Sequence, residues 1–173
     1  MNFTNPVQNQ SLTPYIQGTA SITSNVVGWS NATLYIPGTS GNYVSLGTNT
    51  PTNIDMSSGN INLFIEAWVY IINVVTTSAI IERPHPSGGA DNYGLFINSG
   101  NCSEFFVNHS VSTSTAQGQT QLTAGSWWHI AGSYNASTKN VYVFTNGTVG
   151  VTVGTCTGVP LYTSTYNTEI GYN

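Results

Sequence analysis

The chain has 173 residues, of which only 5% are charged, and its formal net charge is −4. A single domain of this length can bury enough surface to fold without a metal or a dense disulfide framework. Lys and Arg together number only two, so the chain lacks the basic patch that binds phosphates, and we exclude a nucleic-acid partner.

Residues 1–40 are polar and contain Pro6, Pro14 and Pro37, which predicts an N-terminal arm or weakly paired edge strands. Over residues 41–173, short runs of Val, Ile, Tyr, Phe and Thr alternate with clusters of Gly, Asn, Ser and Pro. This pattern is typical of an all-β domain. The predicted strands are Tyr43–Leu46, Leu63–Ile72, Ala79–Glu82, Tyr93–Asn98, Glu104–Val111, Trp127–Tyr134, Val141–Thr145 and Thr148–Thr155.

Two of these strands define the fold class. Leu63–Ile72 is apolar on both alternating faces, which predicts a central strand covered on both sides, with Trp68 largely buried. Asn146-Gly147 predicts a tight hairpin after Val141–Thr145, because this pair tolerates the positive φ angles of a type I′ turn. We therefore predict an all-β fold, a two-sheet antiparallel jelly-roll sandwich.

Two adjacent tryptophans and a histidine lie on the predicted strand Trp127–Tyr134. Because side chains alternate along a strand, Trp127 and His129 share one face and Trp128 lies on the other. We expect one tryptophan to pack between the sheets and the other to cover an edge or outer face, with His129 bonded to a neighbouring strand. A catalytic histidine would need a nucleophile or carboxylate nearby, and this stretch contains none.

The chain lacks the roughly 20 consecutive apolar residues of a membrane span, and its N-terminus lacks the features of a secretory signal. We expect no membrane insertion. Cys102 and Cys156 either pair in an oxidising compartment or remain free thiols. Candidate glycosylation sequons, which a chain rich in Asn, Ser and Thr also produces by chance, include those at Asn31, Asn101, Asn108, Asn135 and Asn146.

Six segments resemble, in order and spacing, the laminin-G-like family within the concanavalin A-like lectin/glucanase superfamily. They are GNYVSLG, LFIEAWVYI, AIIER, YGLFIN, LTAGSWWHIAGSYNASTKNVYVFTNGTVG and TEIGYN, and the resemblance covers Gly41 to Tyr172. Its most specific element is a Trp-x-His followed by Ala-Gly-x-Tyr and an Asn-Gly hairpin. The resemblance implies that these positions determine the fold rather than bind a ligand; they are Trp127, His129, Ala131, Gly132, Tyr134, Asn146 and Gly147.

Family members usually continue beyond the Ile-Gly found here at Ile170-Gly171 into a further strand that closes the sheet. The edge left open would be paired by residues 1–40, by the rest of a longer polypeptide or by a neighbouring subunit. We favour external contacts. We therefore expect other protein subunits as partners and no free monomer in the working state.

The superfamily includes retaining glucanases, whose two catalytic carboxyls must lie about 5 Å apart, typically in a Glu-x-Asp-x-x-Glu motif. This chain has no such motif, and its carboxylates are scattered along the sequence. We predict a protein that is not an enzyme and has no catalytic residue. The carboxylates are Asp55, Glu66, Glu82, Asp91, Glu104 and Glu169.

The segment PHPSGGADNYG is the candidate ligand-binding loop, since sugars are held by planar polar groups and aromatic stacking. Asp91 and Asn92 would bond hydroxyls, Gly88 and Gly89 would permit close approach, and Tyr93 would stack; the alternative is an ordinary Gly-rich surface turn. Some relatives bind calcium, and Asp91 and Asn92 are the only adjacent pair that we nominate for it.

These observations predict a non-catalytic binding or adhesion module, with glycans as candidate ligands, in an extracellular or virion assembly. A purely structural subunit of a capsid or surface layer is the alternative. A glycoside hydrolase is less favoured.

Overall fold

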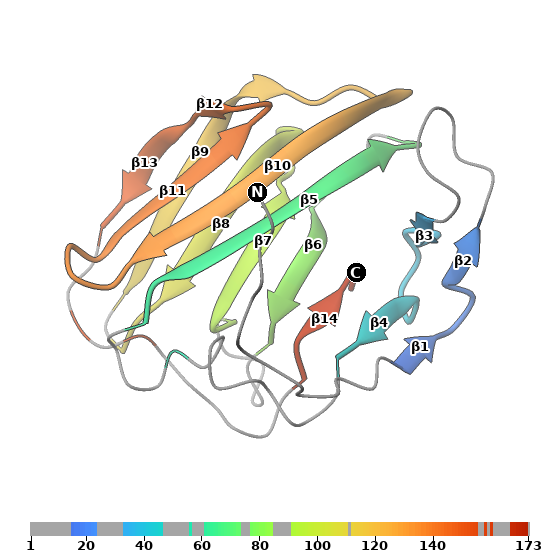
Figure 1. Cartoon of the computed structure of the whole chain (residues 1–173), viewed down its shortest axis with the longest axis horizontal. Helices are drawn as coiled ribbons and strands as arrows, with labels where there is room; N and C mark the ends of the chain where they lie inside the picture. The colour runs from blue at the N-terminus through green and yellow to red at the C-terminus, as the bar shows by residue number, and fades with distance from the viewer. Residues whose placement is uncertain are drawn as a thin grey trace, which may run out of the picture.

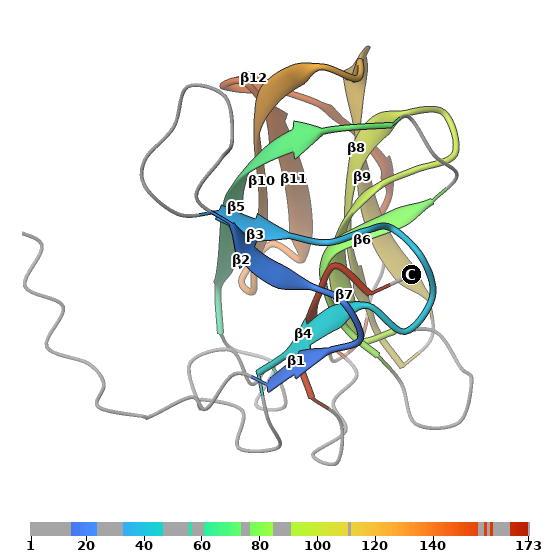
Figure 2. The same cartoon turned by 90° about the vertical axis from the view of Figure 1, so that its right-hand side faces the viewer.

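The computed structural model describes residues 15–23, 33–46, 56, 61–73, 77–84, 91–110, 112–155, 158, 160 and 167–172. In these residues fourteen strands and no helix are present, and all the pairings between strands are antiparallel. An eight-stranded sheet and a four-stranded sheet lie in separate layers, and a two-stranded hairpin lies beside them (Figures 1 and 2). The predicted fold class is confirmed.

The eight-stranded sheet has the order β1-β4-β14-β6-β7-β8-β9-β13, and the four-stranded sheet has the order β12-β11-β10-β5. The third pair is β2-β3. The bounds are β1 (Tyr15–Gln17), β2 (Ser21–Thr23), β3 (Thr33–Tyr35), β4 (Tyr43–Ser45), β5 (Leu63–Ile71), β6 (Ser78–Arg83), β7 (Tyr93–Ile97), β8 (Cys102–Asn108), β9 (Thr113–Gln121), β10 (Ser126–Asn135), β11 (Asn140–Thr145), β12 (Thr148–Val149), β13 (Val151–Gly154) and β14 (Glu169–Ile170).

The core lies between the two large sheets. On the eight-stranded sheet, Leu95, Phe105 and Val107 are fully buried, and on the four-stranded sheet Ile130 and Val143 are fully buried. Burying a side chain of this size contributes about 1.5–3 kcal/mol to folding. The alternation of buried and accessible residues on β7, β8, β10 and β11 follows from this arrangement.

The Asn-Gly hairpin is confirmed. Asn146 and Gly147 have φ angles of 48° and 79° and connect β11 to β12. β12 still belongs to the four-stranded sheet, whereas β13 pairs with β9 of the other sheet. The chain therefore crosses from one sheet to the other at Gly150, between β12 and β13.

The structure corrects the placement of the predicted central strand. β5 pairs with β10 along nine positions, but among the described residues no strand pairs with its other edge, and Trp68 is 48% exposed. The strand reads as apolar on both faces because its inner face carries aliphatic residues and its outer face carries exposed aromatic residues. Apolar character on both faces therefore did not imply burial on both faces.

Polar composition concealed one long strand. β9 (TSTAQGQTQ) pairs with β8 and β13 within the eight-stranded sheet. Its buried residues are the small ones, Ser114, Ala116 and Gly118. A side chain at Gly118 would collide with Ser103 and Thr145. The backbone of this strand therefore packs closely against its neighbours, without large side chains in between.

Among the described residues Cys102 is a free cysteine, and its Sγ lies 3.7 Å from the carbonyl oxygen of Gly100. Cys156 lies outside the described residues, so the choice between a disulfide and two free thiols stays a prediction. Within the described part of the chain, no helix is long and apolar enough to span a bilayer.

Candidate functional site

The predicted binding loop does not present its aromatic residue. Tyr93 is 2% exposed and belongs to the hydrophobic core, and its hydroxyl lies 3.4 Å from Oγ1 of Thr168. Its ring therefore cannot stack on a sugar, which corrects that prediction. Asn92 is 1% exposed, Asp91 is half-buried, and Gly88 and Gly89 lie outside the described residues.

The burial of Tyr93 has a simple cause. Tyr93, Leu95 and Ile97 occupy alternate positions of β7 and all three point into the core. The alternation in the sequence YGLFI could have indicated this.

As for calcium at Asp91 and Asn92, no group of three His, Cys, Asp or Glu residues that could hold a metal is found in the described part of the chain.

Several sequons are also engaged in the structure. Asn108 is 4% exposed and donates from Nδ2 to the carbonyl oxygen of Asp91, so its amide is unavailable for glycosylation. Asn146 accepts a hydrogen bond from the backbone N–H of His129, and Asn135 accepts from the turn that follows it. Asn101 is half-buried with a φ of 58°, and Asn31 lies outside the described residues.

The structure instead gathers aromatic side chains on the outer face of the four-stranded sheet. In the register of β5 and β10, Trp127 lies opposite Tyr70, and His129 lies opposite Trp68. The Tyr70 and Trp127 ring centroids are 5.4 Å apart, and those of Trp68 and His129 are 5.2 Å apart. We call this surface the aromatic face; its residues are Phe64, Glu66, Trp68, Tyr70, Trp127, His129, Tyr142 and Phe144.

The centre of the aromatic face is polar. Nε2 of His129 lies 3.2 Å from Oε2 of Glu66 on the neighbouring strand, as the sequence predicted for this histidine. The Glu66 side chain is 58% exposed and that of His129 is 26% exposed. The face therefore combines exposed rings with a hydrogen-bonding pair that solvent can reach.

The two tryptophans of β10 divide as the alternation predicted. Trp128 packs against the hydrophobic core and donates its indole Nε1–H to the carbonyl oxygen of Thr123 at 3.1 Å. Trp127 lies on the aromatic face. On the inner side of the same strand, Gly132 allows Phe105 to approach the backbone closely, and Tyr134 is 2% exposed.

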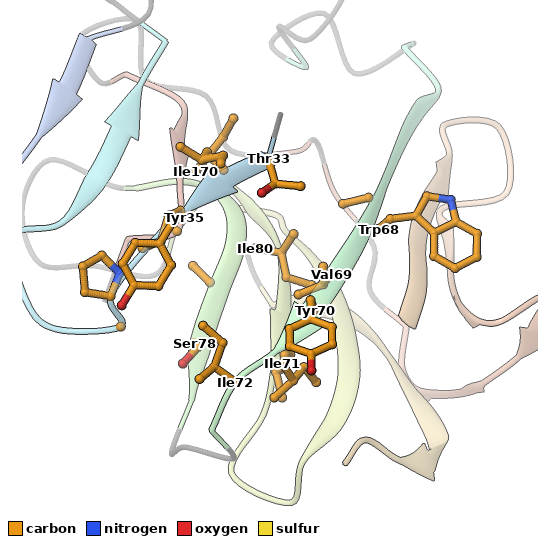
Figure 3. A pocket seen from close by; sticks show the side chains of 18 of the residues that line it. Thr33, Tyr35, Trp68, Val69, Tyr70, Ile71, Ile72, Ser78, Ile80 and Ile170 are labelled. Carbon is orange, nitrogen blue, oxygen red and sulfur yellow. The ribbon is translucent and has the colours of Figure 1, made fainter. Parts of the chain in front are cut away.

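A groove of about 680 Å³ runs along the open edge of β5. Val69 and Ile71 of β5, Ile80 of β6 and Ile170 of β14 line it, and the segment from Thr33 to Gly38 forms a further wall. Figure 3 shows Val69 and Ile80 within the groove. Trp68, Tyr70 and Trp127 of the aromatic face also line the groove, so the two surfaces adjoin along β5.

The fold also brings together carboxylates that are distant in sequence. Glu169 of β14 is the cross-strand partner of Glu82 on β6. Burial, Asp91 and Glu169, in that order, raise the pKa of Glu82 to about 8. Sequence spacing gave no sign of this cluster, because Glu82 and Glu169 meet only through the pairing of β6 with β14.

The described strands define a β-sandwich domain with an aromatic outer face. The sequence matches the family described as the concanavalin A-like lectin/glucanases superfamily over residues 37–173, and the chain belongs to this superfamily. No curated protein matched the chain. Membership supports a carbohydrate- or protein-binding module in general, and laminin-G-like domains are commonly extracellular.

Proposed function

We propose that the protein is a non-catalytic glycan-binding or adhesion module that contacts its ligand through the aromatic face. The observation that carries this proposal is the placement of Trp68, Tyr70 and Trp127 around the Glu66–His129 pair. Sugar rings stack on aromatic faces and their hydroxyls bond to planar polar groups, and this face offers both.

The charge of the chain selects among glycans. The net charge is −4 and the acidic Glu66 lies at the centre of the face. Sialylated or sulfated glycans would meet like charge there without a basic side chain to compensate, since Lys and Arg number only two in the whole chain. Neutral oligosaccharides are therefore the expected class.

Catalysis is not part of the proposal. A glycosidase needs two carboxyls that reach opposite sides of the scissile bond. Glu82, which lies opposite Glu169 in the strand register, is only 5% exposed, so a polysaccharide cannot reach it directly. We expect no release of reducing sugar from a panel of β-glucans above that of the denatured protein, and a reproducible release would overturn the non-catalytic assignment.

The test of binding is a glycan array probed with the wild type, Trp68→Ala and Trp127→Ala. Tyr15→Ala is the matched control, because Tyr15 is an exposed aromatic residue, 63% accessible, on β1 away from the face. We expect neutral glycans to bind the wild type and the control, and at least tenfold weaker binding to both tryptophan variants. Binding that both substitutions leave unchanged would move the site elsewhere.

A structural subunit of an extracellular or virion assembly is the second candidate. Within the described ranges no strand pairs with the outer edge of β5, and this edge and the apolar groove beside it favour this candidate, because an unpaired strand edge can pair with another chain. Light scattering of the isolated chain at micromolar concentration tests it. If the chain assembles and binds no glycan on the array, the structural subunit is supported. A stable monomer would refute it.

A further inference from the structure

β14 is a short strand that connects two parts of the eight-stranded sheet. It is a strand of two residues, Glu169 and Ile170, and it lies between β4 and β6. In the described part of the chain, β1 and β4 join the rest of the sheet only through β14. Gly171 donates to the carbonyl oxygen of Ile80 at 3.1 Å, and Leu46 donates to that of Thr168 at 2.8 Å. Among the described residues, these two hydrogen bonds and the two-residue ladders of β14 with β4 and β6 keep this junction closed.

β14 also forms one wall of the groove. Ile170 and Gly171 both line it, and Gly171 lies so close to Ile36 that a β-carbon at this position would collide with the Ile36 side chain. Displacement of β14 would therefore open the groove and free the β1–β4 pair at the same time.

The strand register places like charges at this junction. Glu169 lies directly opposite Glu82, and opposed like charges destabilise strand pairing. On the other side of Glu82, Gly94 of β7 offers no side chain. Arg83 follows Glu82 but pairs with Tyr93, so its side chain points to the inner face.

The surrounding groups disfavour ionisation at this junction. Burial first, then Asp91 and Glu169, raise the pKa of Glu82 to about 8, and burial followed by Asp91 raises the pKa of Glu169. On β4, the pKa of Tyr43 is raised by burial, then by Glu169 and Tyr172. The carboxyl that is buried most deeply, Glu82, thus keeps its proton at neutral pH while β14 is docked.

We propose that β14 is a proton-dependent clasp, in which the protonated carboxyl of Glu82 keeps β14 docked, and ionisation of Glu82 opposite Glu169 releases β14 and opens the groove. When β14 leaves, Glu82 loses part of its burial and the neighbouring charge of Glu169, so its pKa falls toward the ordinary value of 4.5. The docked state therefore binds more protons than the open state over a range that lies between pH 4.5 and about 8. Docking is strongest below this range and weakens as the pH rises through it, by up to about tenfold per pH unit for one proton.

Amide hydrogen exchange at pH 5.5 and 8.5 tests the clasp. Protection factors, which remove the intrinsic effect of pH on exchange, are measured for the N–H groups of Leu46 and Gly171. The N–H of Gly150, which donates to the carbonyl oxygen of Val143 on β11 of the four-stranded sheet, is the internal reference. In the wild type we expect protection at Leu46 and Gly171 to fall by about tenfold or more with rising pH, while that at Gly150 stays within about twofold.

Variants separate the clasp from a general effect of pH. Glu82→Gln removes the titrating group, so we expect it to abolish the fall in amide protection at Leu46 and Gly171. Glu169→Gln is expected to reduce that fall. Glu104→Gln is the matched control, because Glu104 lies on the same sheet and pairs with Phe96 of β7, away from β14; it should keep the wild-type fall. The proposal would be overturned if protection at Leu46 and Gly171 in the wild type did not change with pH, or if protection at Gly150 fell equally. It would also be overturned if Glu82→Gln showed the same fall as the wild type.

Discussion

The two faces of the four-stranded sheet are built from the same strands but differ in what their aromatic residues contact. On the inner face, Tyr134 is 2% exposed and Phe105 of the opposite sheet packs against Gly132. On the outer face, Phe64 is 60% exposed, Trp68 is 48% exposed, and their neighbours include the Glu66–His129 pair. Aromatic residues on opposite faces of the same sheet therefore meet either close packing or solvent.

This difference separates stability from recognition. Removing a close-packed inner residue leaves a cavity, and the cost grows with the size of that cavity. Removing an outer residue leaves only solvent. Substitutions on the inner face should lower stability, whereas those on the aromatic face should chiefly change binding.

The largest effect is expected from a matched pair of tyrosines. Tyr134→Ala should lower the free energy of unfolding by about 3–5 kcal/mol, because it empties a buried site beside the core. Tyr142→Ala, on the aromatic face where Tyr142 is 38% exposed, should cost about 1 kcal/mol or less. Urea denaturation of both variants checks this, and equal losses would contradict the contrast between the faces.

The next effect concerns the close approach at Gly132. A methyl group there would meet the ring of Phe105, so Gly132→Ala should cost about 1–3 kcal/mol through overpacking. Ser133→Ala, one position along β10 and on the outer face, is the control and should change stability by about 0.5 kcal/mol or less. If thermal unfolding shows the same loss of stability in both variants, the packing at Gly132 is looser than the structure indicates.

A smaller effect on stability is expected at Trp68. Its ring is half exposed, so Trp68→Ala should cost about 1 kcal/mol, well below the 3–5 kcal/mol typical of a buried tryptophan. The same variant should lose glycan binding. Calorimetric unfolding measures the first effect, and a loss typical of core residues would show that Trp68 is covered in solution.

The smallest effect is expected at the Glu66–His129 pair. Because Glu66 is 58% exposed, solvent screens the interaction and Glu66→Gln should change stability by about 0.2–1 kcal/mol. The amide keeps an oxygen that accepts hydrogen bonds, so neutral glycans should still bind. A loss of 2 kcal/mol or more in chemical denaturation would contradict a solvent-screened pair.

The fold was largely predictable because its determinants are local. Asn146-Gly147 specifies its own turn, and the alternation along β10 assigned Trp127 and Trp128 to opposite faces. β9 escaped prediction because its inner residues are small, and hydrophobic periodicity cannot detect a strand that packs through Ser114 and Gly118.

The candidate site was less predictable because it depends on pairings that are distant in sequence. The sequence contained one usable signal, since β5 alternates aliphatic residues with Phe64, Glu66, Trp68 and Tyr70. Whether that second set is covered depends on which elements pack over that face of β5, and periodicity does not determine this. Glu82 and Glu169, 87 residues apart (169 − 82), likewise meet only in the folded sheet.

The most direct test of the aromatic face follows the tryptophan indole N–H signals by ¹H–¹⁵N NMR during titration with a neutral oligosaccharide identified on the array. Trp128 is an internal control, because its indole N–H donates to Thr123 and its ring packs against the core. The account predicts that the Trp68 and Trp127 signals shift in a saturable way while that of Trp128 stays in place. Saturable binding that leaves Trp68 and Trp127 unchanged would contradict it.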